Sequence, residues 1–169
     1  MSTATQLHCV YIKAAPQRIW DAITRPEWTV RYGYGAPVHF ELRAGGAYRS
    51  TPSDDMRKYA AEHGFPMGDV IVDGEVVECD PPRRLVQTWR MLMDPATAAE
   101  PFTRLTYDIE ELPHQPGVCR LTITHDLTGA PATAAQTGGS TELTDGGGGW
   151  PWILSDLKSL LETGSAFTR

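Results

Sequence analysis

His125 is the residue best placed to do chemistry in this chain. It shares one face of a predicted strand with Leu121 and Ile123, because alternate residues of a strand point the same way. A histidine on an apolar face must find a protein partner, a water molecule or a ligand, and beside a tyrosine it could transfer a proton. The alternative is a histidine at a strand end that reaches solvent, and the sequence leaves both open.

Large side chains form the second group with functional potential. Strand alternation and helix spacing turn eight of them toward one interior face: Phe40, Tyr48, Trp89, Met91, Tyr107, Trp150, Trp152 and Leu154. Together with His125 they are the predicted ligand-binding residues. Plain core packing is the alternative for each, since large aromatics dominate both cores and cavities.

A glycine-punctuated loop carries further aromatic residues. Tyr32 and Tyr34 lie within this loop and Trp28 lies shortly before it. They could form an aromatic gate at a cavity, or they could pack down as a plug.

Local motifs for other chemistry are absent from the sequence. It contains no GxSxG or HExxH, and the glycine run at 146–149 lacks the preceding strand and the spacing of a nucleotide-binding loop. Its three cysteines and five histidines are scattered and include no CxxC pair. We therefore expect no metal site, no cofactor and no catalytic residue that a motif would identify.

The last long helix, predicted over 150–163, is the element that would position the tryptophans. Its apolar residues follow the spacing of one helical stripe, whereas Asp156, Lys158, Ser159 and Glu162 lie off that stripe. Pro151 is tolerated only in the first turn, and Gly164 follows where a left-handed cap is usual. One side of this helix must be buried.

Alternation with a period of two predicts an antiparallel sheet over most of the remaining chain. The predicted strands span 7–12, 38–42, 47–50, 70–79, 84–91, 104–110 and 119–125. Proline and capping residues predict helices over 15–24, 27–30 and 54–62, the last inside an excursion at 51–67.

Residues 129–149 have no apolar period and are interpreted as a mobile loop. The sheet therefore has one dry face and one wet face, with Glu75, Asp108 and Arg49 on the wet side.

Composition restricts the classes of partner. The chain has 169 residues and a formal net charge of -6, with a pI near 5.3. This length fits a single domain over 1–169, and the acidic balance argues against nucleic acid as a partner. The sequence shows neither a signal peptide nor a membrane span, so we expect no membrane partner and a cytoplasmic location.

Four stretches resemble one known family. They are 15–24 (APQRIWDAIT), 42–49 (LRAGGAYR), 74–89 (GEVVECDPPRRLVQTW) and 149–154 (GWPWIL). In this order they resemble the AHSA1-like branch of the START/Bet v 1-like SRPBCC superfamily, the branch related to the activator of the Hsp90 ATPase. The resemblance implies an α+β helix-grip fold, in which about six to seven strands curve around the C-terminal helix and two short helices follow the first strand.

The resemblance also implies a function. Members of the superfamily hold apolar or aromatic small molecules between sheet and helix, and some are cyclases, aromatases or hydrolases. We therefore expect a small apolar or aromatic ligand in this groove. The alternatives are a cofactor-independent enzyme that uses the same pocket and a chaperone-associated stress-response protein acting through its surface. A homodimer is also compatible with the family.

Overall fold

The computed structural model describes residues 4–140, 142 and 147–169. Seven strands form one antiparallel sheet in the order β1-β7-β6-β5-β4-β3-β2. The strands are β1 (Thr5–Ile12), β2 (Val38–Phe40), β3 (Ala47–Ser50), β4 (Val72–Asp80), β5 (Arg84–Met91), β6 (Thr103–Glu111) and β7 (Cys119–Asp126). The helices are α1 (Pro16–Thr24), α2 (Pro26–Thr29), α3 (Asp54–His63), α4 (Pro95–Ala98), α5 (Pro131–Thr137) and α6 (Gly149–Thr163).

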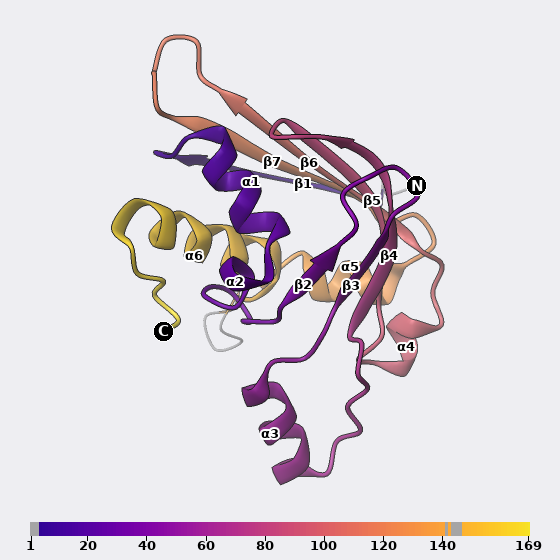
Figure 1. Cartoon of the computed structure of the whole chain (residues 1–169). Coiled ribbons are helices and arrows are strands. Elements are labelled where there is room, and N and C mark those ends of the chain that lie inside the picture. Colours follow the sequence, from indigo (N-terminus) through magenta and orange to yellow (C-terminus); the bar gives the residue numbers. More distant parts are fainter. Residues whose placement is uncertain (1–3, 141, 143–146) are drawn as a thin grey trace.

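The sheet curves, and α6 lies on its concave side together with α1 and α2 (Figure 1). One apolar stripe on α6 and the inward residues of the strands form a single hydrophobic core, in which Leu105, Ile123 and Leu157 are almost completely buried. A curved sheet gripping one long helix is the α+β helix-grip fold, so the predicted architecture is confirmed, including the two short helices after β1.

Strand register determines which side chains enter the concave side. Tyr107 of β6 lies opposite Ile123 of β7, and Leu105 lies opposite His125. Leu85 of β5 lies opposite Tyr107 on its other side. Because side chains alternate along a strand, all of these point to the same face. The predicted dry face is therefore the concave one.

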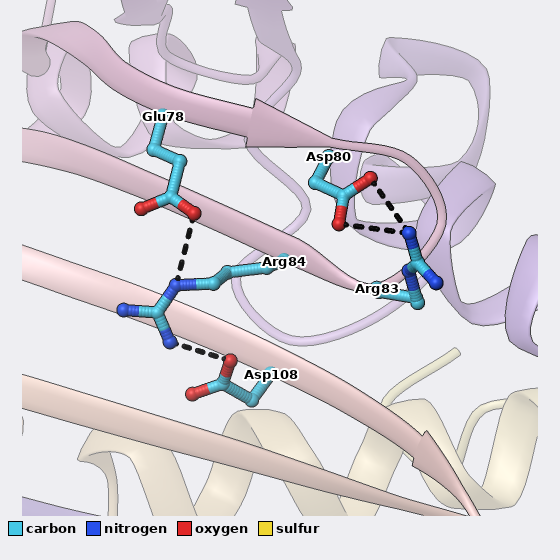
Figure 2. A network of polar contacts seen from close by, with 5 residues as sticks. All are labelled: Glu78, Asp80, Arg83, Arg84 and Asp108. Carbon is cyan, nitrogen blue, oxygen red and sulfur yellow. Dashed lines mark hydrogen bonds and ion pairs between the residues drawn. The ribbon is translucent and has the colours of Figure 1, made fainter.

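Charged side chains of the β4–β5 hairpin lie on the other face of the sheet. Arg84 Nε lies 3.4 Å from Glu78 Oε1, and its guanidinium donates to Asp108 Oδ1 at 2.7 Å (Figure 2). Arg83 pairs with Asp80 at the turn, 3.2 Å away. Such half-exposed pairs contribute little stability each, roughly 0–1 kcal/mol, and their main consequence is that these charges stay away from the core.

Helix α6 has the predicted ends but one unexpected buried residue. Pro151 lies in its first turn, and Gly164 caps its C-terminus with a left-handed backbone. Asp156 was expected off the apolar stripe, yet its exposed fraction is 0%. The prediction was wrong because Asp156 borders the stripe, three residues after Ile153 and four before Leu160, and finds hydrogen-bond donors in residues 33, 167 and 168.

The segment 129–149 differs from the predicted mobile loop where it is described; residues 141 and 143–146, including Gly146 of the glycine run, lie outside the described residues. Residues Pro131–Thr137 form helix α5. Its buried side chains are Thr133 and Thr137 rather than apolar residues, so no apolar period marks the helix in the sequence. The Glu100 carboxylate accepts hydrogen bonds from the N–H groups of Ala132 (2.6 Å) and Thr133 (2.9 Å), which caps α5 from a distant loop.

Helix α3 follows the predicted pattern and stands away from the rest of the fold (Figure 1). The Ser53 hydroxyl accepts from Met56 N at 3.2 Å as its N-cap, and Gly64 is its left-handed C-cap. None of the helices in the described part of the chain has the length and apolar content needed to span a bilayer.

Candidate ligand-binding cavity

A cavity of about 390 Å³ lies between the concave face of the sheet and α6, and it is partly open to solvent. This volume is within the range of about 300–1,000 Å³ typical of small-molecule sites. Its wall comes from strands β2 to β7, from helices α1, α2, α5 and α6 and from the loop at 31–37, with Met56 of α3 and Met93 also contributing. Segments far apart in sequence therefore meet around one space.

Six of the nine predicted site residues lie at this wall: Tyr48, Trp89, Met91, Tyr107, Trp150 and Leu154. Tyr48, Trp89, Trp150 and Leu154 are each less than 10% exposed. The two indoles are 6.3 Å apart between centroids, and Tyr107 meets Trp150 edge-on at 6.4 Å. These rings form a continuous aromatic wall, held in the tilted and edge-to-face arrangements that aromatic pairs favour.

Three predicted residues do not reach the cavity wall. Phe40 packs on the ring of Tyr48, with centroids 4.5 Å apart. Trp152 lies two residues after Trp150, which on a helix puts it on a different side, and it packs edge-on against Phe167 at 5.0 Å.

His125, the third of these, lies behind the two indoles. Its ring is 5.3 Å from Trp89 and 5.9 Å from Trp150 between centroids, and its exposed fraction is 0%. The strand-end interpretation, a histidine that reaches solvent, is therefore wrong.

Hydrogen bonds determine the protonation state of His125. Trp150 Nε1 donates to Nδ1 at 3.1 Å, so Nδ1 must carry a lone pair. Thr103 Oγ1 donates to Trp89 O at 2.8 Å and lies 2.8 Å from Nε2, which is therefore the protonated nitrogen. Both ring nitrogens are occupied, and the imidazole is neutral.

Burial lowers the pKa of His125 to about 4, with a further lowering by His8 and an opposing effect of Asp126. Thr103 was not singled out from the sequence. Leu105, two residues further along β6, lies opposite His125 in the sheet register, so Thr103 shares its face and reaches the ring.

The tyrosines at the wall are un-ionised. Burial raises the pKa of Tyr32, Tyr48 and Tyr107 far above the usual value, and mutual repulsion between the phenolates would raise that of Tyr107 further.

Tyr32 donates to Ala22 O at 2.8 Å. The Tyr34 hydroxyl accepts from Gly149 N at 3.1 Å, which joins the loop at 31–37 to the start of α6. Tyr32 is buried and packs into the core, whereas Tyr34 is 51% exposed and borders the opening of the cavity.

Asp156 of α6 also holds the loop at 31–37. Its carboxylate accepts from Gly33 N at 2.8 Å and Phe167 N at 2.7 Å, and also from the Thr168 hydroxyl. The loop, α6 and the C-terminal segment are thus tied at one buried carboxylate. These bonds fix the wall around Gly33.

The wall carries no Asp, Glu, Lys, Arg or His side chain within the described ranges. In the same part of the chain, no group of three or more His, Cys, Asp or Glu residues is arranged to hold a metal ion. The cavity can therefore offer apolar surface, aromatic rings and neutral hydrogen-bonding groups.

The family model described as "Activator of Hsp90 ATPase homolog 1-like protein" matches residues 13–162. The chain belongs to this AHSA1 family, a branch of the helix-grip SRPBCC proteins. Among curated proteins, none matches the sequence.

Protein MLL2253 and DynU16 are solved structures that share the fold at low identity. Protein MLL2253 from Mesorhizobium loti is 19% identical, with 94% of this chain and 96% of that chain covered and a TM-score of 0.64. DynU16, described as a putative protein in the dynemicin biosynthetic locus, is 21% identical, with 96% and 49% covered and a TM-score of 0.62. CalU16 from Micromonospora echinospora is 18% identical, with 72% and 59% covered and a TM-score of 0.49. The chain thus spans about half of DynU16 and 59% of CalU16.

Proposed function

We propose that this protein binds a small apolar or aromatic molecule in the cavity under α6, without a cofactor. The observation that carries the proposal is an open space of about 390 Å³ beside a largely apolar wall with two indoles. Transferring apolar surface from water to such a wall is favourable by roughly 25 cal/mol per Å². A ligand gains this transfer free energy only where the protein's own side chains leave the space unfilled.

The wall is organised before a ligand arrives, which lowers the cost of binding. His125 fixes the indole of Trp150, and Tyr34 and Asp156 hold the loop on the other side. The six residues named above are the proposed ligand contacts. Phe40, His125 and Trp152 are proposed as supports of the fold around the site rather than as ligand contacts.

Thermal unfolding with a library of small apolar and aromatic compounds tests the proposal. A compound that binds the folded state raises Tm, by an amount that grows with its concentration. Val38 lies at the wall, so Val38→Trp should fill the space and abolish the shift. Val77→Trp is the matched control, because Val77 is 39% exposed and does not line the cavity. Shifts that are equal in the two variants, or absent with every compound, would refute the proposal.

An enzyme using His125 with a pocket tyrosine is the alternative drawn from the sequence. The structure gives this arrangement little support, because both nitrogens of His125 are occupied and its ring lies behind Trp89 and Trp150. The phenols also have raised pKa values and are poor bases at neutral pH.

Chaperone association is a second candidate, suggested by the family's description and by one surface. Tyr59, His63 and Phe65 stack on and beside α3, with Tyr59 and Phe65 more than half exposed. Exposed aromatic surface of this kind is typical of protein contacts. Capture of Hsp90 by the wild type, but not by a Tyr59→Ser, Phe65→Ser variant, would support it.

A further inference from the structure

The chemistry of the wall indicates which apolar molecules the cavity prefers. We propose that it selects an uncharged aromatic molecule carrying a hydroxyl or carbonyl oxygen, which accepts hydrogen bonds from the Tyr48 and Tyr107 hydroxyls. This inference rests on the proposed function, since it concerns the ligand of the same site.

The described wall offers no opposite charge to an ionised ligand. A carboxylate or ammonium group that enters this space loses its water and meets no opposite charge. Burial raises the pKa of Tyr48 and Tyr107, so neither supplies a compensating charge at neutral pH, and each keeps an O–H group. Fatty acids and aromatic acids are therefore poor ligands.

Tyr48 has a proton available to donate. The side chains of Trp89 and Gln87 lower the pKa of Tyr48 and so oppose the larger effect of burial. Indole and carboxamide N–H groups are donors, so neither takes the Tyr48 proton. The fully buried amide oxygen of Gln87 has no partner among the described residues, so the Tyr48 proton is not used there.

Tyr107 offers a second donor nearby. Its ring lies against Trp150, and its hydroxyl has no hydrogen-bond partner in the described part of the chain, whereas the hydroxyls of Tyr32 and Tyr34 are both paired. Tyr48 and Tyr107 line the same cavity, Tyr48 from β3 and Tyr107 from β6. An oxygen atom of a ligand can thus accept from either hydroxyl.

The aromatic part of the ligand would lie along the indoles. Trp89 and Trp150 expose ring surface to the cavity beside Tyr107. Ring faces and edges gain more from aromatic partners than from saturated ones of the same size. The preferred molecule is therefore a flat ring system of about two rings or more with one neutral oxygen substituent.

Isothermal titration calorimetry at pH 7.5 with naphthalene, 2-naphthol, 2-naphthoate and decahydro-2-naphthol tests the inference. We expect 2-naphthol to bind about three- to tenfold more tightly than naphthalene, as one neutral hydrogen bond provides. Decahydro-2-naphthol should bind more weakly than 2-naphthol, and 2-naphthoate should show no binding.

Tyr107→Phe and Tyr48→Phe should reduce the preference for 2-naphthol over naphthalene, measured as the ratio of the two affinities within each variant. Tyr59→Phe, an exposed tyrosine on α3, is the matched control and should keep the full preference. An unchanged preference in both cavity variants, or binding of 2-naphthoate as tight as that of 2-naphthol, would overturn the inference while leaving the proposed function standing. Failure of all four probes to bind the wild type would overturn both.

Discussion

His125 shows how one buried polar residue determines the shape of an apolar wall. Its neutral ring accepts from Trp150 and donates to Thr103, so the indole at the start of α6 has one orientation. Protonation would put a second proton on Nδ1, facing the indole N–H. The histidine is therefore a positioning residue for the cavity wall, and its protonation should cost stability.

Acid should reveal this cost. The folded-state pKa of His125 is about 4, below the unfolded value of 6.5, so the unfolded state binds the proton first. Stability is therefore fully present above pH 6.5 and falls as the pH drops toward 4, by about 3 kcal/mol for this residue. Urea unfolding at several pH values measures it.

His125→Gln should be less stable than the wild type at pH 7 but should lose less on acidification. His8, whose pKa burial also lowers, contributes in the same direction and remains in both proteins, so their difference reports His125 together with its repulsion by His8. Parallel pH profiles for the two proteins would contradict the neutral tautomer assigned here.

Strand alternation and helix spacing were enough to predict six wall residues, because the face on which a side chain lies depends on its position along the strand or helix. It could not predict that His125 lies behind the indoles, since that depends on the helix that covers the sheet. Asp156 was missed for a related reason. Its hydrogen-bond donors come from residues 33, 167 and 168, and no local pattern brings them together.

At the scale of elements, α5 is held by a residue outside its own sequence. Glu100 accepts from two N–H groups of its first turn and from the Thr133 hydroxyl. The helix in turn places Gln136 and Thr137 at the cavity wall. Strands and long helices were predictable from their periods, whereas this short helix depends on a cap supplied by tertiary structure.

Removal of this cap should loosen α5. Glu100→Ala leaves the N–H groups of the first turn unpaired and should destabilise the protein by about 1–2 kcal/mol. Hydrogen exchange of residues 131–137 should quicken more than that of β6. Glu111→Ala, at an exposed position of β6, is the control and should leave exchange in α5 unchanged. Exchange in α5 that is equal in both variants would show that Glu100 does not hold the helix.

At the scale of the whole molecule, one face of the sheet carries ion pairs and the other lines the cavity. The segment 74–89 carries much of the resemblance to the family, yet its charged residues Glu78, Arg83 and Arg84 pair on the face opposite the cavity or at the turn (Figure 2). These pairs help to specify the hairpin, so the family signature predicts the fold better than it predicts the ligand. The ligand depends instead on residues such as Tyr48, Trp89 and Tyr107 on the concave face.

The most direct test of a binding site under α6 is to measure which tryptophan resonances shift when a ligand is added. The chain has five tryptophans, and each gives one indole N–H resonance in a ¹⁵N spectrum. On addition of 2-naphthol, the resonances of Trp89 and Trp150 should shift, because these indoles line the cavity. Those of Trp28 and Trp152, which do not line it, should stay in place. Shifts confined to Trp28 or Trp152, or no shift at all, would contradict a binding site under α6.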